Sequence, residues 1–393
     1  DIGAQSTIGA VYTDRIEGDN YNRVAGLDTH IVFGGDRYVF DGQVATSFTR
    51  IGTNPELNGK PMYDFALNRT GREFGWNVGI EAYHPEFITQ SGFIRRTGIT
   101  HARIIPRWTW FPKNSFIRTI SFQPRAEGTW DWDRFMKGTF PNDLQMNSFT
   151  NAVFTNGWRA HVFHWSETFK YPADFYASYY TARANATTGV ADTVPYVGTD
   201  RLTNVGVMTN ISTPQWRQFS ASAEIGGGQD DNFDEWSSAL ILNETISLNW
   251  QPTEKLRVSG RYLEQRVYRK SDGSLVKISS APRLKMEYQI NRPMFFRFVG
   301  QYSSSKRDAL RDDSRTEAPI LIRNSDGSFR PSTAQEGGSF RADWLFSYQP
   351  NPGTVLFAGY GGSLASESYF APSELERVND GFFVKLSYLW RAK

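Results

Sequence analysis

Apolar and polar side chains alternate at every second position through much of the chain. In the segment 282–291, Leu284, Met286, Tyr288 and Ile290 are separated by charged or polar residues. A β-strand produces this pattern because its successive side chains point to opposite faces. The runs last about ten residues, the length that a tilted strand needs to cross the hydrocarbon layer of a membrane. The pattern therefore predicts strands with one apolar and one polar face.

The alternation and the turn signals between runs predict eighteen strands, and sixteen would also fit. The two faces are least distinct in the segments 62–68, 145–155 and 158–169. The predicted strands are 5–15, 21–33, 38–50, 62–68, 74–84, 100–110, 116–130, 145–155, 158–169, 202–212, 216–227, 237–250, 255–269, 282–291, 294–304, 339–349, 354–363 and 380–391.

Short and long connections alternate between these strands, which separates two readings of the pattern. A soluble sheet with one solvated face would show the same side-chain alternation. Short turns on one rim and long loops on the other are typical of outer-membrane barrels. The short links include 34–37, 156–157, 213–215, 251–254, 292–293 and 349–353, and the long ones 51–61, 85–99, 131–143, 170–200, 228–235, 270–280, 306–337 and 363–380.

We therefore predict one domain over residues 1–393, a transmembrane antiparallel up-and-down β-barrel in the outer membrane of a Gram-negative bacterium. The short turns and both termini would lie in the periplasm, and the long loops outside the cell. The expected partners are the lipid bilayer and lipopolysaccharide, and a periplasmic or surface protein could be a further partner.

Composition excludes several other classes of protein. Hydrophobic residues make up 39% of the chain and the mean hydropathy is −0.50, with no apolar run long enough for a membrane helix. The net charge is +2 and no basic stripe appears, which argues against a nucleic-acid partner. The chain has no cysteine, so disulfides and thiolate metal sites are excluded.

Aromatic residues are frequent, at 15% of the chain, and many lie at the ends of predicted strands. Rings in a soluble core would sit in the middle of strands, whereas rings beside turns suit the membrane–water interface. The predicted interface aromatics are Trp108, Trp110, Trp130, Trp216, Trp250, Tyr348 and Trp390.

Several short segments resemble an uncharacterised barrel family of Gram-negative outer membranes. They are Thr7-Ile8-Gly9, Tyr12-Thr13-Asp14-Arg15, Asn22-Arg23-Val24-Ala25-Gly26-Leu27-Asp28, Asp41-Gly42-Gln43, Ser91-Gly92-Phe93-Ile94-Arg95-Arg96 and Phe383-Val384-Lys385-Leu386-Ser387-Tyr388-Leu389-Trp390. In that family the barrel usually follows a carbohydrate-binding-module-like β-sandwich, which we expect to lie outside this chain. The resemblance implies a barrel fold and no catalytic residues.

The chain offers little material for catalysis or for a metal site. It has five histidines and no Gly-x-Ser-x-Gly motif, so we expect no enzyme, no cofactor and no metal. His161 and His164 would point to opposite faces of a strand. The weak exception is an acidic loop that could bind calcium, formed by Asp230, Asp231, Asp234 and Glu235.

The most informative chemistry is the charge predicted for the lumen. By alternation the lining holds ten basic and three acidic residues: Arg103, Arg107, Arg125, Glu127, Arg257, Arg261, Arg283, Lys285, Glu287, Arg297, Arg341, Asp343 and Lys385. An open pore with this lining would favour anions mildly. In the alternative, these charges pair with one another and 85–99 or 306–337 folds into the lumen, with Phe93, Ile94, Arg95 and Arg96 as the plug.

The leading hypothesis is thus a porin-like channel or transport-related protein for small hydrophilic solutes. The second is a plugged, non-conducting barrel that acts as a scaffold or binding partner for an envelope protein or a glycan. The third, an outer-membrane hydrolase, is disfavoured by the few histidines.

Overall fold

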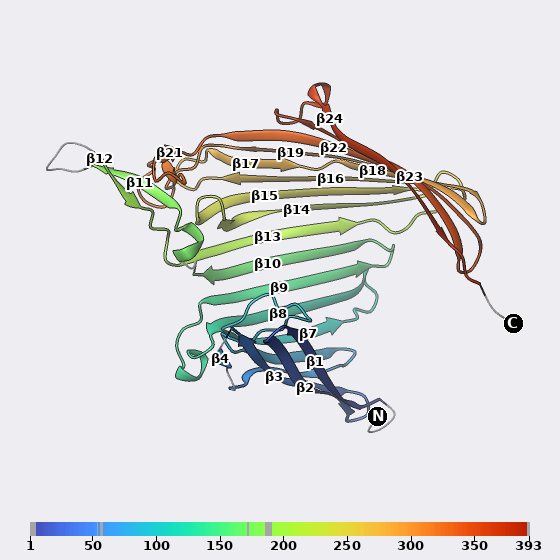
Figure 1. Cartoon of the computed structure of the whole chain (residues 1–393). Helices are drawn as coiled ribbons and strands as arrows, with labels where there is room; N and C mark the ends of the chain where they lie inside the picture. The colour runs from blue at the N-terminus through green and yellow to red at the C-terminus, as the bar shows by residue number, and fades with distance from the viewer. Residues whose placement is uncertain (1–4, 53, 56–57, 171–172, 185–190, 391–393) are drawn as a thin grey trace. The chain divides into compact units, whose positions relative to one another are not determined.

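The computed structural model describes residues 5–52, 54–55, 58–170, 173–184 and 191–390, which form two compact units (Figure 1). Unit 1 comprises residues 1–152 and 163–170, and unit 2 comprises residues 153–162 and 171–393. Helical structure in the described residues amounts to three short 3-10 segments, η1 (Phe135–Lys137), η2 (Ala173–Tyr176) and η3 (Pro372–Glu374). Within this part of the chain, no helix has the length and apolar character needed to span a membrane.

Unit 1 is an antiparallel sheet in which each long strand pairs with the next one along the chain. The two-residue strand β4 pairs with the end of β3, so β3 continues the sheet through β5. The strands are β1 (Thr7–Glu17), β2 (Asn20–Phe33), β3 (Tyr38–Ile51), β4 (Asn54–Pro55), β5 (Lys60–Arg69), β6 (Phe74–Tyr83), β7 (Ile99–Trp110) and β8 (Ile117–Asp131). The hairpin of β9 (Asp143–Phe154) and β10 (Arg159–Phe169) follows, and the division between the units runs through it.

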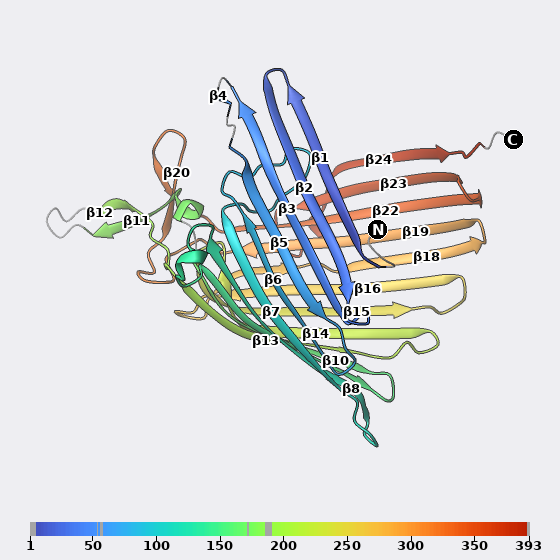
Figure 2. The ribbon, with the colours of Figure 1, turned by 90° about the horizontal axis from the view of Figure 1, so that it is seen from below.

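Unit 2 continues the same up-and-down order (Figure 2). Its main sheet pairs β13 (Leu202–Ser212), β14 (Phe219–Asn232), β15 (Ser237–Trp250), β16 (Leu256–Tyr268), β18 (Arg283–Asn291), β19 (Met294–Arg307), β22 (Gln335–Asn351), β23 (Thr354–Ser366) and β24 (Glu376–Ser387). β17 (Leu275–Ser280) lies between β16 and β19, in line with β18. All eighteen predicted strands are therefore present, and the predicted fold class is confirmed.

The register gives each sheet an apolar face and a polar face. On the apolar face of unit 2, Leu248 lies opposite Gly260, which lies opposite Leu284. Ile246 and Leu248 on this face remain 48% and 44% exposed. Shallow hollows with almost entirely apolar linings follow this face in both units, around Ile80 and Ile104 in unit 1 and around Leu248 and Leu284 in unit 2. Such a continuous exposed apolar surface requires an apolar environment.

The polar faces carry rows of charged and amide side chains. In unit 1 one row runs through Asp64, Glu81, His101 and Thr129 on β5 to β8. In unit 2 one row runs from Ser247 on β15 through Arg261, Arg283, Gln301 and Arg341. The alternation read from the sequence is thus a real separation of faces.

Short turns close the strands at one end of each unit. The β9–β10 turn is held by the Trp158 carbonyl, which accepts a hydrogen bond from the backbone N–H of Phe154. Its Gly157 has a φ of 88°, in the left-handed region that glycine reaches without strain. The β1–β2 turn at Gly18 and Asp19 is as short, although it lies at the end where the other connections are long.

Four segments predicted as loops contain strand residues in the structure. The predicted loop 270–280 contains β17, which continues the direction of β18 across a break at Pro282. Proline lacks an N–H donor, so the ladder is interrupted there. In 228–235, β14 extends to Asn232 because Gly228 to Asn232 pair with β15. Segments 170–200 and 306–337 contribute strands to a second sheet.

This second sheet, which we call the loop sheet, forms from two long connections of unit 2. It comprises β11 (Tyr179–Ala184), β12 (Ala191–Pro195), β20 (Ile320–Arg323) and β21 (Phe329–Pro331), in the order β12–β11–β20–β21. Tyr180 on β11 lies opposite Leu321 on β20. The loop sheet lies beyond the ends of the long strands of unit 2 (Figure 1). Segment 306–337 is therefore a folded part of the rim.

Candidate functional site

The polar faces carry every charged residue predicted to line the lumen. Register places four of them in unit 1, where Arg103 lies opposite Glu127. In unit 2, Glu287 lies opposite both Arg257 and Arg297. The full set is Arg103, Arg107, Arg125 and Glu127 in unit 1, and Arg257, Arg261, Arg283, Lys285, Glu287, Arg297, Arg341, Asp343 and Lys385 in unit 2. Their role as a lumen lining stays a prediction.

The charged groups of unit 1 are joined in hydrogen-bonded networks. Glu127 is 5% exposed, and its Oε2 accepts a hydrogen bond from Arg125 at 2.7 Å and lies 3.1 Å from Nε2 of His101. Arg103 donates to Asn77 at 3.1 Å. Arg107 donates to the carbonyl of Gly71 at 3.0 Å. On this face the predicted basic residues are therefore held by the protein itself.

A second network in unit 1 lies around His30. Its Nδ1 is 2.6 Å from Asp41, whose other oxygen accepts a hydrogen bond from Asn68. A histidine and a carboxylate could share a proton in catalysis, yet both groups here are half exposed and tied into a cross-strand network. The arrangement is that of a polar wall.

The polar face of unit 2 differs because four of its arginines have no hydrogen-bond or ion-pair partner among the described residues. These four are Arg257, Arg261, Arg283 and Arg297. Lys285 and Arg341 are paired along their own strands, with Glu287 at 3.0 Å and Asp343 at 3.1 Å. A hollow of about 850 Å³ on this face is lined by Arg283, Lys285, Arg297, Arg341, Asp343 and Ser363.

Segment 84–98, between β6 and β7, folds onto the polar face of unit 1. Phe87 is 4% exposed and packs against Val24 and Met62, with Ile94 beside this cluster. Burial of one phenylalanine side chain stabilises the docked segment by about 1.5–3 kcal/mol.

Hydrogen bonds from side chains of β2 and β3 also hold segment 84–98 on the sheet. Asn22 is almost fully buried, its amide donates to the Ile88 carbonyl at 2.9 Å, and its Oδ1 accepts from the backbone of Gln90 at 2.8 Å. Ser47 accepts a hydrogen bond from the backbone of Ile88. Lys60 forms an ion pair with Glu86.

The residues that dock this segment are not those singled out in the sequence. Of the predicted plug residues, Phe93 is 89% exposed, Arg95 is exposed and Arg96 pairs with Asp143 at 3.6 Å. Ile94 alone lies against the cluster of Phe87. The sequence signal that could have identified Phe87 is the apolar pair Phe87-Ile88 within an otherwise polar part of the loop.

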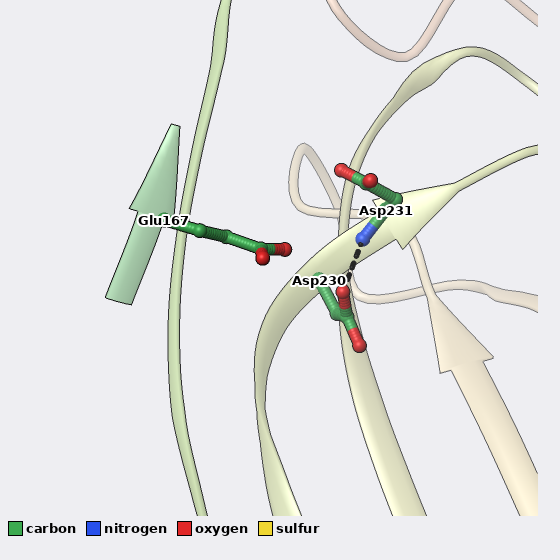
Figure 3. A group of neighbouring side chains, drawn as sticks. All are labelled: Glu167, Asp230 and Asp231. Carbon is green, nitrogen blue, oxygen red and sulfur yellow. Dashed lines mark hydrogen bonds between the residues drawn. The ribbon is translucent and has the colours of Figure 1, made fainter. Parts of the chain in front are cut away.

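Two of the four carboxylates of the predicted calcium loop, Asp234 and Glu235, are engaged with basic side chains, and calcium binding by this loop stays a prediction. Asp234 pairs with Arg307 at 3.4 Å and Lys277 at 3.6 Å. Asp231 accepts a hydrogen bond from Asn204. Asp230 accepts one at 2.8 Å from the backbone N–H of Asp231 at the end of β14 (Figure 3). Figure 3 also draws Glu167, which lies on β10 in unit 1.

The fourth carboxylate, Glu235, is the centre of a buried ion pair. The side chains of Glu235 and Arg269 are 0% and 1% exposed, and the closest contact between them is 2.6 Å. Arg269 also donates to Asp308 at 2.9 Å and to the carbonyl of Ala309 at 2.8 Å. Burial raises the pKa of Glu235 above its ordinary value, and the hydrogen bonds from Arg269 oppose that rise.

This ion pair fastens the base of the loop sheet. Glu235 accepts a hydrogen bond from the backbone of Arg311 at 3.0 Å, and its carbonyl accepts one at 2.7 Å from the buried Tyr196 hydroxyl. The two connections that contain β12 and β20 therefore both form hydrogen bonds with Glu235, in the turn between β14 and β15. The acidic loop is a structural anchor.

Most of the predicted interface aromatics lie on apolar faces beside turns. Trp108 packs against Phe74 at the short-turn end of unit 1, and Trp216 stacks on Phe219 in unit 2. Trp130 lies beside segment 132–142 and donates to the Thr139 carbonyl. Trp110, Trp250 and Tyr348 lie at strand ends and are exposed, whereas Trp390 follows the end of β24.

Solved structures similar to this chain share its fold. The FrpB iron transporter of Neisseria meningitidis matches in its F5-1 apoprotein form with a TM-score of 0.51, 10% identity, and coverage of 94% of this chain and 62% of that one. The F3-3 variant gives a TM-score of 0.50 at 10% identity, covering 95% of this chain and 64% of that one. OmpT of Vibrio cholerae, an outer membrane protein, matches at a TM-score of 0.37 and 10% identity, covering 87% of this chain and 95% of that one.

These likenesses show the fold of a large outer-membrane β-barrel, which agrees with the predicted fold class and outer-membrane location. The chain spans less than two thirds of the length of the FrpB chains. No family model matches this chain, and no curated protein matches it. The family resemblance of the sequence segments stays a prediction.

Replacing Arg269 with methionine leaves Glu235 buried without its cation. Breaking such a pair costs about 3–5 kcal/mol, and the loss falls on the loop sheet. We expect faster amide hydrogen exchange in 308–334, while the long strands stay protected. Arg330→Gln, on the exposed strand β21, is the control. Unchanged exchange in Arg269→Met would contradict the anchoring role.

Replacing Phe87 with alanine removes the buried ring that docks segment 84–98. The change lowers the free energy that holds the segment on the sheet by about 3–5 kcal/mol. The remaining hydrogen bonds of Asn22 contribute less than this and do not keep the segment docked. We expect exchange in 84–98 to rise at least tenfold, and Phe93→Ala, at an exposed site of the same segment, to have little effect. Equal effects of the two variants would show that the ring does not hold the segment.

Proposed function

We propose that this protein is an outer-membrane channel for small hydrophilic solutes with a mild preference for anions. The observation that carries the proposal is the polar face of unit 2, where Arg257, Arg261, Arg283 and Arg297 have no hydrogen-bond or ion-pair partner in the described part of the chain. Arginine keeps its charge at any accessible pH, so a pore lined by these groups attracts anions and repels cations. A barrel of sixteen or more strands is wide enough for an aqueous channel.

The second candidate is a plugged barrel that serves as a scaffold or a binding partner for an envelope protein or a glycan. Segment 84–98 supports it, because this segment covers part of the polar face of unit 1 with a buried ring and four hydrogen-bonded or ionic contacts to Asn22, Ser47 and Lys60. The folded loop sheet offers an ordered surface for such a partner.

We also propose that the barrel has no enzymatic activity. The sequence lacks a nucleophile elbow, and the histidine–carboxylate pairs His30 with Asp41 and His101 with Glu127 are parts of cross-strand networks. The lipid bilayer is the environment that the fold implies, and lipopolysaccharide is the proposed contact at the outer end.

Planar-bilayer recording of the purified protein separates the first two candidates. We expect stable conductance steps, with a reversal potential under a potassium chloride gradient that shows chloride passing more readily than potassium. Silence at saturating insertion would contradict the channel. If Phe87→Ala then converts silent insertions into conducting ones, the plugged barrel is supported.

A further inference from the structure

The arginines of unit 2 form a continuous patch rather than a scattered lining. Arg261 on β16 lies directly opposite Arg283 on β18, so their side chains leave the sheet at neighbouring points of the same face. Residues directly opposite each other on antiparallel strands have Cβ atoms about 4.5–5.5 Å apart. Arg283 lies opposite Gln301, and Gln301 lies opposite Arg341. One rung of the sheet thus presents three guanidinium groups and an amide.

The next rungs extend the patch in the same direction. Arg297 on β19 and Lys285 on β18 line the same hollow as Arg283 and Arg341. The hollow measures about 850 Å³, which is large enough for a small organic anion, and Ser363 adds a hydroxyl to its lining. Its carboxylates are already engaged, since Asp343 holds Arg341 and Asp380 holds Arg377. Arg283 and Arg297 therefore keep their donors for a ligand.

Like charges placed directly opposite each other destabilise a sheet. In unit 1 every predicted basic lining residue has a polar partner, which shows that this fold supplies partners to arginines on its polar face. Arg261 and Arg283 have none among the described residues. An amide or a carboxylate in place of one of these two arginines would make the sheet more stable. An anion that bridges the guanidinium groups of Arg261 and Arg283 would remove their repulsion.

We propose that Arg261, Arg283 and Arg297 form a binding site for small oxyanions that carry two or more negative charges, such as phosphate esters and dicarboxylates. Guanidinium groups bind carboxylate and phosphate oxygens through paired N–H donors, and several such groups favour a multivalent anion over chloride. Arg261 and Arg283 are exposed and Arg297 is partly exposed, so binding is reversible and weakens as salt concentration rises. This site names the solute class of the proposed channel and rests on that proposal for its biological role.

The direct test is isothermal titration of the intact protein in detergent with inorganic pyrophosphate. The wild-type protein should bind pyrophosphate, with affinity falling as sodium chloride is raised. Arg283→Gln should weaken binding about fivefold, the upper range for one exposed ion pair, and Arg283→Lys should restore most of it. Arg217→Gln, an equal charge change in the turn between β13 and β14, is the matched control. Heat-dependent migration on gels checks that each variant is folded.

No binding by the wild type, or an equal loss in Arg217→Gln, would overturn the site. Conductance of the same preparation keeps the two proposals apart. Conduction without pyrophosphate binding removes the site and leaves the channel, whereas binding without conduction leaves the site and removes the channel. Replacing pyrophosphate with succinate tests the carboxylate branch of the class, and binding of phosphate alone would narrow the solute to phosphate compounds.

Discussion

The structure depends on one constraint: along much of each long strand, alternate side chains are apolar and stay exposed on the same face of a sheet. Ile246, Leu248 and Leu284 in unit 2 and Ile104 in unit 1 all lie on such faces. In water this surface would drive aggregation, whereas acyl chains accept it without loss. The antiparallel ladder satisfies the backbone groups that lipid cannot. The polar face then carries the charged residues predicted to line the lumen.

The two units use that polar face differently. In unit 1 the charged groups are paired in cross-strand networks such as His101 with Glu127, and segment 84–98 covers part of the face. In unit 2 the long loops fold among themselves into the loop sheet, which rests on Arg269 and Glu235, and the arginines of the polar face stay available. This difference separates a structural wall from a surface that can attract solutes.

The strands could be predicted from the sequence because alternation is a local property that each strand carries by itself. What the sequence could not supply was contact between distant segments. Three contacts join residues that are far apart in the chain. They are the pairing of β11 with β20, the packing of Phe87 against Val24, and the ion pair between Glu235 and Arg269. The ion pair of Glu235 could not be foreseen from the acidic loop alone, because its partner Arg269 lies on another hairpin. The short strand β17 lies within the predicted loop 270–280, and its pairing with β19 likewise joins distant segments.

The central claim is that alternate residues of one strand contact lipid and water, and a spin-label scan of β15 from Leu240 to Asn249 tests it most directly. The chain has no cysteine, so each single-cysteine variant carries one label without background reaction. In reconstituted bilayers, labels at Leu242, Ile246 and Leu248 should collide with oxygen, and labels at Asn243, Thr245 and Ser247 with a water-soluble nickel complex. Equal accessibility to the nickel complex at all positions would contradict the account.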